Sequence, residues 1–237
     1  YTEILASYLK EEGELIAAHF DPSMGDFAKR VRGNFEKKLA SSSVYDRVKL
    51  VSLNTQYSEA ESVDAVVTFR NLHNWIGPNW DFIITSAHKS LKKGGVLGVV
   101  EHRAKQGTSL ENMKKTGYVT EEYAIESIEK LGFKLVAKSE INSNPKDTKD
   151  HPKGVWTLPP VMRLKELDQD KYLQIGESDR FTFLFKKFGA VPFGSFFLYS
   201  GIFSLNTILI EGIAIVSELA MNLLPEAWGD SKAKRCN

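Results

Sequence analysis

The sequence predicts an α/β fold in which a mostly parallel β-sheet packs against helices. Short apolar segments alternate with segments of helical periodicity along residues 1–187, which is typical of a parallel sheet with crossover helices. The last two predicted strands have no convincing crossover helix between them, so we expect the final strand to be antiparallel, at or beside an edge. The composition, with 42% hydrophobic and 26% charged residues, excludes a disordered chain, a collagen-like chain and a coiled coil.

The N-terminal third alternates between helix and strand. Apolar residues within positions 4–9 share one face of a helix that is already under way at residue 1. A short apolar run between a glycine and an Asp-Pro turn predicts a buried strand. The residues after this turn have apolar side chains at the spacing of a helix. The elements predicted here are a strand at 15–20, a helix at 25–39, and strands at 48–53 and 63–69.

The middle of the chain continues this alternation. A helix over residues 80–91 is expected to end at Lys92-Lys93-Gly94-Gly95, because basic residues in a last turn followed by glycine terminate helices. Thr120 is the expected N-cap of a helix that Gly132 stops. The predicted strands of this part are residues 96–101, 133–141 and 180–186.

Two segments differ from this alternation. Residues 142–179 are polar and contain proline, and a connection this long is expected to cover a functional site. Residues 188–237 are predicted to be an apolar helical tail, separate from a domain of residues 1–187, with Lys186 and Lys187 as a solvated boundary. Residues 188–210 contain no charge and are long enough to span a bilayer, so the tail is membrane-associated, foreign to the domain, or a buried helical pair.

The charge and cysteine content restrict the partners. A net charge of +1 lacks the basic field of a nucleic-acid-binding protein, so no nucleic-acid partner is predicted. The single cysteine, Cys236, forms no internal disulfide and no zinc cluster. No signal peptide is visible, so we expect a cytoplasmic protein, with membrane association through residues 188–210 as the alternative.

Polar side chains follow four of the predicted strands. In an open α/β sheet, ligands bind at the carboxyl ends of the strands. Asp21 follows the first strand, where its carboxylate either accepts hydrogen bonds from ribose hydroxyls or only caps a turn. Asn54 follows the second strand, Asn71 and His73 follow the third, and Glu101 ends the fourth. These positions are the candidate site.

Two groups at these strand ends have alternative interpretations. Residues 70–75 place two amides, an imidazole and an indole behind a buried strand, either as a site or as a polar loop anchored by Trp75. Glu101, His102 and Arg103 form either part of the site or a local ion pair. A metal site of His73, Glu101 and His102 is a further alternative, but the sequence shows no close ligand spacing, and no metal is predicted.

The order of these segments resembles the class I S-adenosylmethionine (SAM)-dependent methyltransferase fold, a Rossmann-like three-layer sandwich with an antiparallel last strand. The Leu-Lys-Lys-Gly-Gly-Val-Leu segment at residues 91–97 is a familiar mark of that fold. The resemblance covers about residues 1–187. Further segments, at residues 1–6, 68–75, 101–103 and 144–181, are similar to a group of bacterial methyltransferases of unassigned substrate.

The resemblance implies SAM as the cofactor and an in-line methyl transfer to a small-molecule acceptor that the sequence does not identify. Asp21, Asn54 and Asn71 are then the cofactor-binding residues, His73 is the first candidate for a base, and Glu101 is the second. The first strand and the glycine-rich loop of that fold are missing from this sequence. We therefore expect an N-terminally truncated fragment with impaired cofactor binding and activity.

Two other functions remain open at this stage. An NAD(P)-dependent oxidoreductase also uses an acidic residue after a strand, although Tyr118 and Tyr123 each lack a lysine four residues on. The second alternative is a non-catalytic, membrane-tethered methyltransferase remnant. Titration with SAM and with NAD(P) separates these functions.

Overall fold

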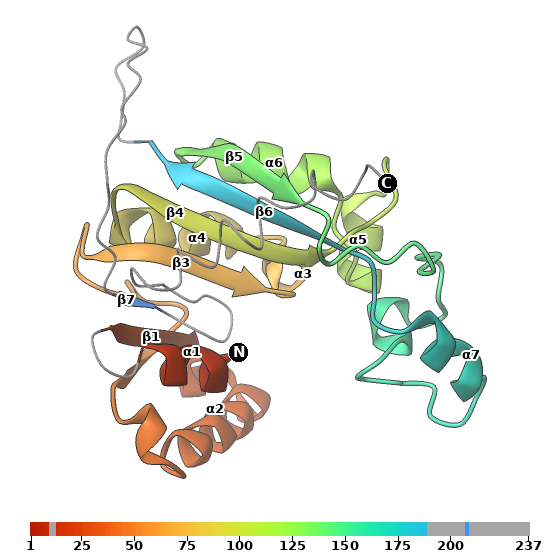
Figure 1. Ribbon diagram of the computed structural model, residues 1–237, viewed down its shortest axis with the longest axis horizontal. Helices are drawn as coiled ribbons and strands as arrows, with labels where there is room; N and C mark the ends of the chain where they lie inside the picture. The colour runs from red at the N-terminus through yellow and green to blue at the C-terminus, as the bar shows by residue number, and fades with distance from the viewer. Residues whose placement is uncertain (10–12, 189–206, 209–237) are drawn as a thin grey trace, which may run out of the picture.

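The computed structural model describes residues 1–9, 13–188 and 207–208, which form a twisted sheet with helices packed against it (Figure 1). Its strands are β1 (Glu14–His19), β2 (Val48–Ser52), β3 (Val63–Phe69), β4 (Leu91–His102), β5 (Phe133–Ser139), β6 (Arg180–Lys187) and β7 (Thr207–Ile208). Its α-helices are α1 (Thr2–Tyr8), α2 (Asp26–Leu39), α3 (Leu72–Trp75), α4 (Trp80–Ser90), α5 (Leu110–Thr116), α6 (Glu121–Glu129) and α7 (Gln169–Ile175), and its 3-10 helices are η1 (Pro22–Met24), η2 (Ser43–Tyr45) and η3 (Gly154–Thr157).

The strands hydrogen-bond in two groups, in the orders β2-β1-β7 and β3-β4-β6-β5. β1 pairs in parallel with β2 and with β7, and β3 pairs in parallel with β4. β7 also contacts β3 and lies between the two groups in Figure 1. The short strand β7 therefore occupies the centre of the sheet, between β1 and β3.

The antiparallel pairing expected of the strand at residues 180–186 is confirmed. β6 pairs antiparallel with both β4 and β5, so it lies one place in from the edge strand β5. Phe181, Phe183 and Phe185 alternate along β6 and so share one face of the sheet, where they are at most 1% exposed. The predicted α/β fold with a mostly parallel sheet is therefore confirmed.

The predicted end of the helix before β4 needs a correction. α4 ends at Ser90, and β4 already begins at Leu91, so the Lys-Lys-Gly-Gly segment lies inside the strand. Leu91 pairs with Val63, and the register shifts between Val63 and Ala65. A side chain at Gly95 would meet the Asp64 carbonyl oxygen at 2.9 Å, so glycine permits this close approach of the two strands.

Three short helices, α3, α5 and α7, were not predicted. Helices of four to seven residues give no measurable apolar period, so only their capping residues could reveal them. α5 has such signals: the Ser109 hydroxyl accepts a hydrogen bond from the Asn112 amide, and Gly117 follows with φ +77°. The Thr120 N-cap of α6 was predicted and is confirmed, because its hydroxyl accepts from the Tyr123 amide.

The boundary at Lys186 and Lys187 is less solvated than the sequence suggests. Lys187 is only 6% exposed, and its Nζ donates to the Leu91 carbonyl at 2.6 Å and pairs with Glu61 at 3.5 Å. The predicted tail, residues 188–237, lies outside the described residues apart from Phe188 and β7. Among the described helices, none is both long and apolar enough to cross a membrane.

The long connection between β5 and β6 packs on α5 through one glycine. Gly154 in η3 has φ +57°, and a Cβ there would lie 2.1 Å from the Thr116 carbonyl oxygen. Gly107 has a similar backbone, with φ +76°, but a Cβ there would meet nothing within 4 Å. Substitutions at the two positions can therefore distinguish the free-energy cost of a left-handed backbone from the cost of a steric clash.

We predict that Gly154→Ala destabilises the protein more than Gly107→Ala. The left-handed backbone should cost about 1–2 kcal/mol at either position. The clash should add about 1–3 kcal/mol at Gly154 only. Urea unfolding of both variants checks this prediction, and equal losses would show that η3 does not dock on α5 as described.

Candidate functional site

Chain order in the sheet reverses between β1 and β3, which is where open α/β sheets bind ligands. The carboxyl ends of β3 and β4 bring His73, Glu101 and His102 together. Asp21 and Asn54 follow β1 and β2 at the other side of this reversal. Within the described residues, no hydrogen bond or ion pair joins them to the three clustered side chains.

Glu101 is the centre of the cluster. It is the penultimate residue of β4 and is completely buried. Its Oε1 lies 3.2 Å from His73 Nδ1 and accepts a 2.8 Å hydrogen bond from the His102 amide. Its Oε2 accepts a 3.2 Å bond from the His73 amide. One carboxylate therefore fixes both the main chain and the ring of His73 at the start of α3.

The electrostatics of the cluster set the proton positions. Burial acts to raise the pKa of Glu101, but His73 and the His102 amide lower it below the ordinary range. No lysine or arginine of the described residues forms an ion pair with Glu101. An ionised carboxylate only accepts hydrogen bonds, so His73 Nδ1 is the donor and its Nε2 is the free acceptor.

His102 is held in the neutral state. Burial lowers the pKa of its imidazole to about 4, although Glu101 acts in the opposite direction. Its Nδ1 bonds the Ser178 hydroxyl, and its Nε2 lies 4.0 Å from Glu101 Oε1. His102 is therefore a neutral neighbour of the His73–Glu101 pair at neutral pH.

The three side chains are also the group best able to hold a metal in the described part of the chain. Each offers a ligand atom, and these atoms lie within 4.8 Å of one another. Two imidazoles and a carboxylate suit a zinc-type ion. However, His73 Nδ1 already lies at hydrogen-bond distance from Glu101 Oε1, and a metal ion bound through that nitrogen would displace this contact. The geometry therefore favours a hydrogen-bonded pair of His73 and Glu101.

The cluster opens onto a cavity of about 290 Å³. His73 and His102 line one side, and the long connection between β5 and β6 covers the other with Trp156, Pro159 and Pro160. The Trp156 ring stands edge-on to the His73 ring, with 5.8 Å between the ring centres. The connection thus lies over the strand ends, as its length led us to expect.

The remaining predicted residues have simpler local contacts. Asp21 caps η1: its Oδ1 accepts from the Ser23 amide and hydroxyl, and these bonds lower its pKa below the ordinary range. Asn71 precedes α3, and its Oδ1 accepts a 2.8 Å bond from Asn74 Nδ2. Asn54 is exposed in the turn after β2.

Asp21 has hydrogen-bonding capacity left for a ligand. Asp21 is a partly exposed carboxylate at the end of β1, beside the reversal of chain order. A carboxylate can accept about four hydrogen bonds, so the contacts with Ser23 leave capacity for ribose hydroxyls. The Asp21 carboxylate is therefore chemically compatible with the ribose of a nucleoside ligand.

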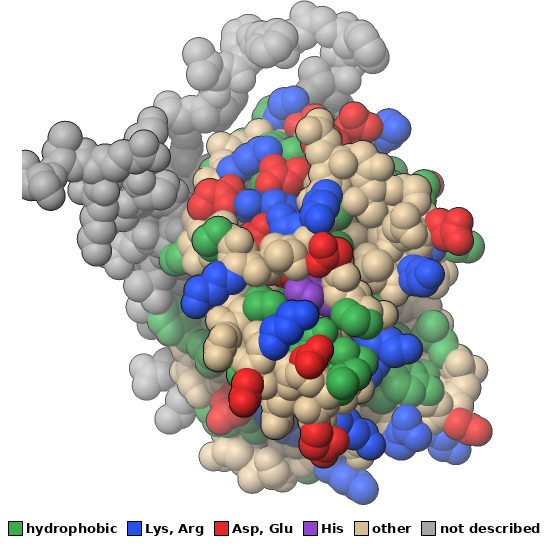
Figure 2. Space-filling model, turned by 90° about the vertical axis from the view of Figure 1, so that its right-hand side faces the viewer, with side chains coloured by type: hydrophobic (Ala, Val, Ile, Leu, Met, Phe, Trp, Pro, Cys, Tyr) green, Lys and Arg blue, Asp and Glu red, His purple; other side chains and the backbone are tan. Residues whose placement is uncertain are grey.

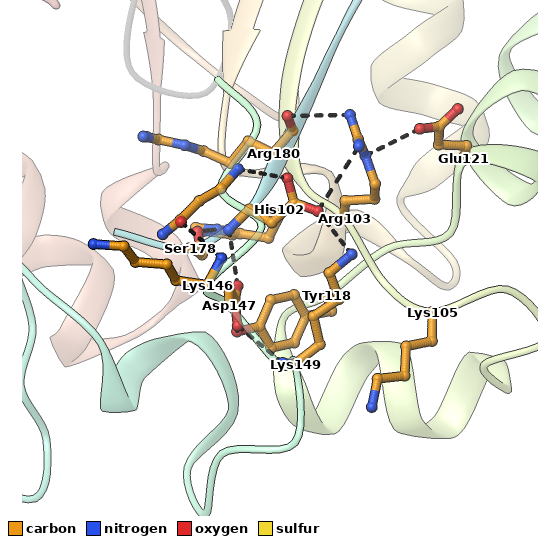
Figure 3. Close-up of polar contacts among 12 residues, drawn as sticks. His102, Arg103, Lys105, Tyr118, Glu121, Lys146, Asp147, Lys149, Ser178 and Arg180 are labelled. Carbon is orange, nitrogen blue, oxygen red and sulfur yellow. Dashed lines mark hydrogen bonds and ion pairs between the residues drawn. The ribbon is translucent and has the colours of Figure 1, made fainter. Parts of the chain in front are cut away.

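A second polar network was missed at the sequence level. The buried Asp147 accepts from the Tyr118 hydroxyl at 3.0 and 2.9 Å, from His151 Nε2 at 2.8 Å, and from the amides of Lys149 and Asp179 (Figure 3). Asp147 stands in an Asn-Pro-Lys-Asp segment, which reads as an ordinary turn. Tyr118 follows α5 and Asp179 directly precedes β6, so no local signal reveals these two distant partners.

Arg103 ties the end of β4 to this network. Its guanidinium pairs with Glu121 at 3.0 Å and with Glu140 at 2.5 Å, and it lies 3.8 Å from Asp179 (Figure 3). Burial acts to lower the pKa of Arg103, but these acids raise it above the ordinary value. Of the two alternatives for residues 101–103, a local ion pair through Arg103 is therefore excluded, because Arg103 contacts other carboxylates.

Known proteins resemble this chain only weakly. No protein-family model and no curated protein matches the sequence. Similar solved structures include the [4+2]-cyclase SpnF, with 15% identity over 79% of each chain and a TM-score of 0.46. Others are a TehB-like SAM-dependent methyltransferase from Corynebacterium glutamicum (15% identity, 77% and 73% covered, TM-score 0.41) and a SAM-dependent methyltransferase from Methanosarcina mazei (14%, 73% and 80%, 0.42).

These likenesses concern the fold alone. The sheet itself has the expected order, with β6 inserted antiparallel between β4 and β5. This sheet order agrees with the one that the sequence led us to expect.

The buried, neutral His102 predicts sensitivity to acid. Unfolded His102 takes up a proton near pH 6.5, whereas the folded chain resists protonation until about pH 4. The unfolded state therefore binds more protons between these values, and stability falls as the pH falls. One such shift is worth about 2 kcal/mol between pH 7 and pH 5. Glu101, whose pKa is lowered, loses its contribution only at still lower pH.

We predict that His102→Asn, or His102→Gln, removes this part of the pH dependence. The free energy of unfolding, measured in urea at pH 7 and pH 5, should fall less in the variant than in the wild type. The difference between the two pH values is the readout, so an overall loss of stability does not disturb it. An unchanged difference would show that His102 titrates normally.

Proposed function

We propose that this protein is a SAM-dependent methyltransferase that acts on a small-molecule acceptor. One observation carries the proposal: the His73–Glu101 pair stands at the carboxyl ends of β3 and β4 and opens onto a cavity beside the reversal of chain order. This is the edge at which the fold binds its ligands. The pair supplies a base at that edge, next to the cofactor's expected place.

The chain's own residues have a limited task in such a transfer. Bound SAM supplies a methyl group on a sulfonium, which is already activated, so the protein must align it with the acceptor atom. His73 Nε2 takes the proton that the acceptor loses. Glu101 holds the ring in the tautomer that exposes Nε2, and its charge stabilises the imidazolium that results.

The other strand ends are assigned to the cofactor. Asp21 accepts hydrogen bonds from the ribose hydroxyls, Asn54 meets the adenine edge, and Asn71 orients the methionine part or the acceptor. Because the sequence shows no glycine-rich turn from a strand to a helix, we expect residues 1–237 to bind SAM weakly. Weak binding here means reduced activity, not a different reaction.

The connection between β5 and β6 keeps water away from the transfer. Trp156 contacts the His73 ring edge-on, and Pro159 and Pro160 line the same cavity. A covered site strengthens the interaction of the imidazolium with Glu101, because the local dielectric is low. The connection thus stabilises the protonated base, His73, and also shields the substrate from water.

Calorimetric titration with SAM and with NAD⁺ tests the proposal. We predict that SAM binds and NAD⁺ does not. Asp21→Ala should weaken SAM binding by about tenfold or more, because hydrogen bonds to a charged group contribute about 1.5–3 kcal/mol. The matched control Asp26→Ala, which removes an exposed carboxylate at the start of α2, should leave SAM affinity unchanged. His73→Gln should also leave it unchanged, because His73 acts on the acceptor.

Two outcomes would contradict the proposal. Binding of NAD⁺ in place of SAM would favour an oxidoreductase. Binding of neither ligand would favour a non-catalytic remnant. If SAM binds but Asp21→Ala has no effect, Asp21 is only the cap of η1.

A further inference from the structure

A second and larger cavity, of about 600 Å³, lies beside the candidate site. It is formed by the segment after β4, by α5 and by the connection between β5 and β6. Figure 2 shows the face of the molecule on this side, where Lys and Arg side chains lie around a histidine, together with acidic and hydrophobic side chains. The proposed reaction does not use this cavity.

The charge of its lining is strongly positive. Its basic residues are Lys105, Lys115, Lys149, Lys153 and Arg163, and its one acidic residue is Asp150. Lys149 is paired with Asp179 at 2.7 Å, and Lys105 lies 3.8 Å from Asp150. The other three cations form no ion pair with any residue in the described ranges. The cavity therefore contains positive charge in excess of its own acids.

A buried hydrogen-bond network holds part of the lining of this cavity. Tyr118 and His151 line it, and both bond the buried carboxylate of Asp147. The His151 ring also stands edge-on to Tyr172 of α7. Figure 3 shows Tyr118, Asp147 and Lys149 converging, with Lys105 nearby on the segment after β4. This network thus fixes part of the lining, and Lys153 lies two residues after His151.

Aromatic rings join this cavity to the candidate site. Trp156 lines both cavities, and the Arg163 guanidinium lies 4.7 Å from the centre of its ring. Tyr118 of the large cavity stands edge-on to His102 of the small one, at 6.3 Å. One ligand can therefore have its reacting atom beside His73 and a second group beyond Trp156.

We infer that the acceptor carries a phosphate group, which binds in the large cavity against Lys115, Lys153 and Arg163. A phosphate carries close to two negative charges and accepts several hydrogen bonds, which matches the unpaired cations. The Arg163 guanidinium lies over the Trp156 ring, and this contact leaves its N–H groups available to the anion. This inference rests on the proposed function for the identity of the ligand as acceptor.

Inorganic phosphate is the probe, and binding is followed by calorimetry and by tryptophan fluorescence at constant ionic strength. We expect saturable binding to the wild type. The double variant Lys153→Gln/Arg163→Gln should bind phosphate about tenfold or more weakly, since two charge-assisted hydrogen bonds are lost. The control Lys93→Gln removes an exposed charge near the start of β4, at the far end of that strand, and should bind like the wild type.

Measurements of SAM affinity on the same variants test the phosphate site and the proposed function independently. SAM affinity of the double variant should equal that of the wild type, because the large cavity does not hold the cofactor. Phosphate binding without SAM binding would support the cavity and contradict the methyltransferase. Phosphate binding that does not saturate, or that Lys93→Gln weakens equally, would overturn the inference, since a general charge effect would explain it.

Discussion

The hydrogen bonds of one buried carboxylate determine how the candidate site is built. Glu101 is fully buried, and no lysine or arginine of the described residues pairs with it. A charge in that position is tolerated only when hydrogen bonds satisfy it, and they come from the ring and amide of His73 and the amide of His102. The short helix α3 and the end of β4 are thereby held together, and His73 Nε2 is left as the acceptor.

Most strands and the longer helices could be predicted, because apolar strands and helix caps are local signals. Examples are the antiparallel strand β6 and the N-cap of α6, Thr120. The sequence also pointed to His73 and Glu101, because polar residues directly after a buried strand require a partner. It did not show that the two side chains touch, and it left the partners of Arg103 open. Contacts of this kind join residues that are far apart in the chain, as His73 and Glu101 are, and no local pattern contains them.

The length of the connection between β5 and β6 predicts that it covers the site. The connection also forms part of the large cavity, and this second role depends on Asp147. This residue sits in an ordinary turn sequence, yet its carboxylate gathers Tyr118, His151 and two amides. The same connection places Trp156 between two cavities of different character, one with the histidines and one with the cations. A division of this kind suits a ligand that has a neutral reacting end and an anionic anchor, and it follows from the packing of the connection on α5.

The most direct test of this account is the tautomer of His73, measured by ¹⁵N-resolved NMR of the imidazole rings at neutral pH. Assignment by His73→Gln identifies the ring. The account predicts a proton on Nδ1 and a free Nε2 in the wild type, and loss of this preference in Glu101→Gln. A proton on Nε2 in the wild type would contradict it, since the nitrogen next to Glu101 would not be the donor and the base would face away from the cavity.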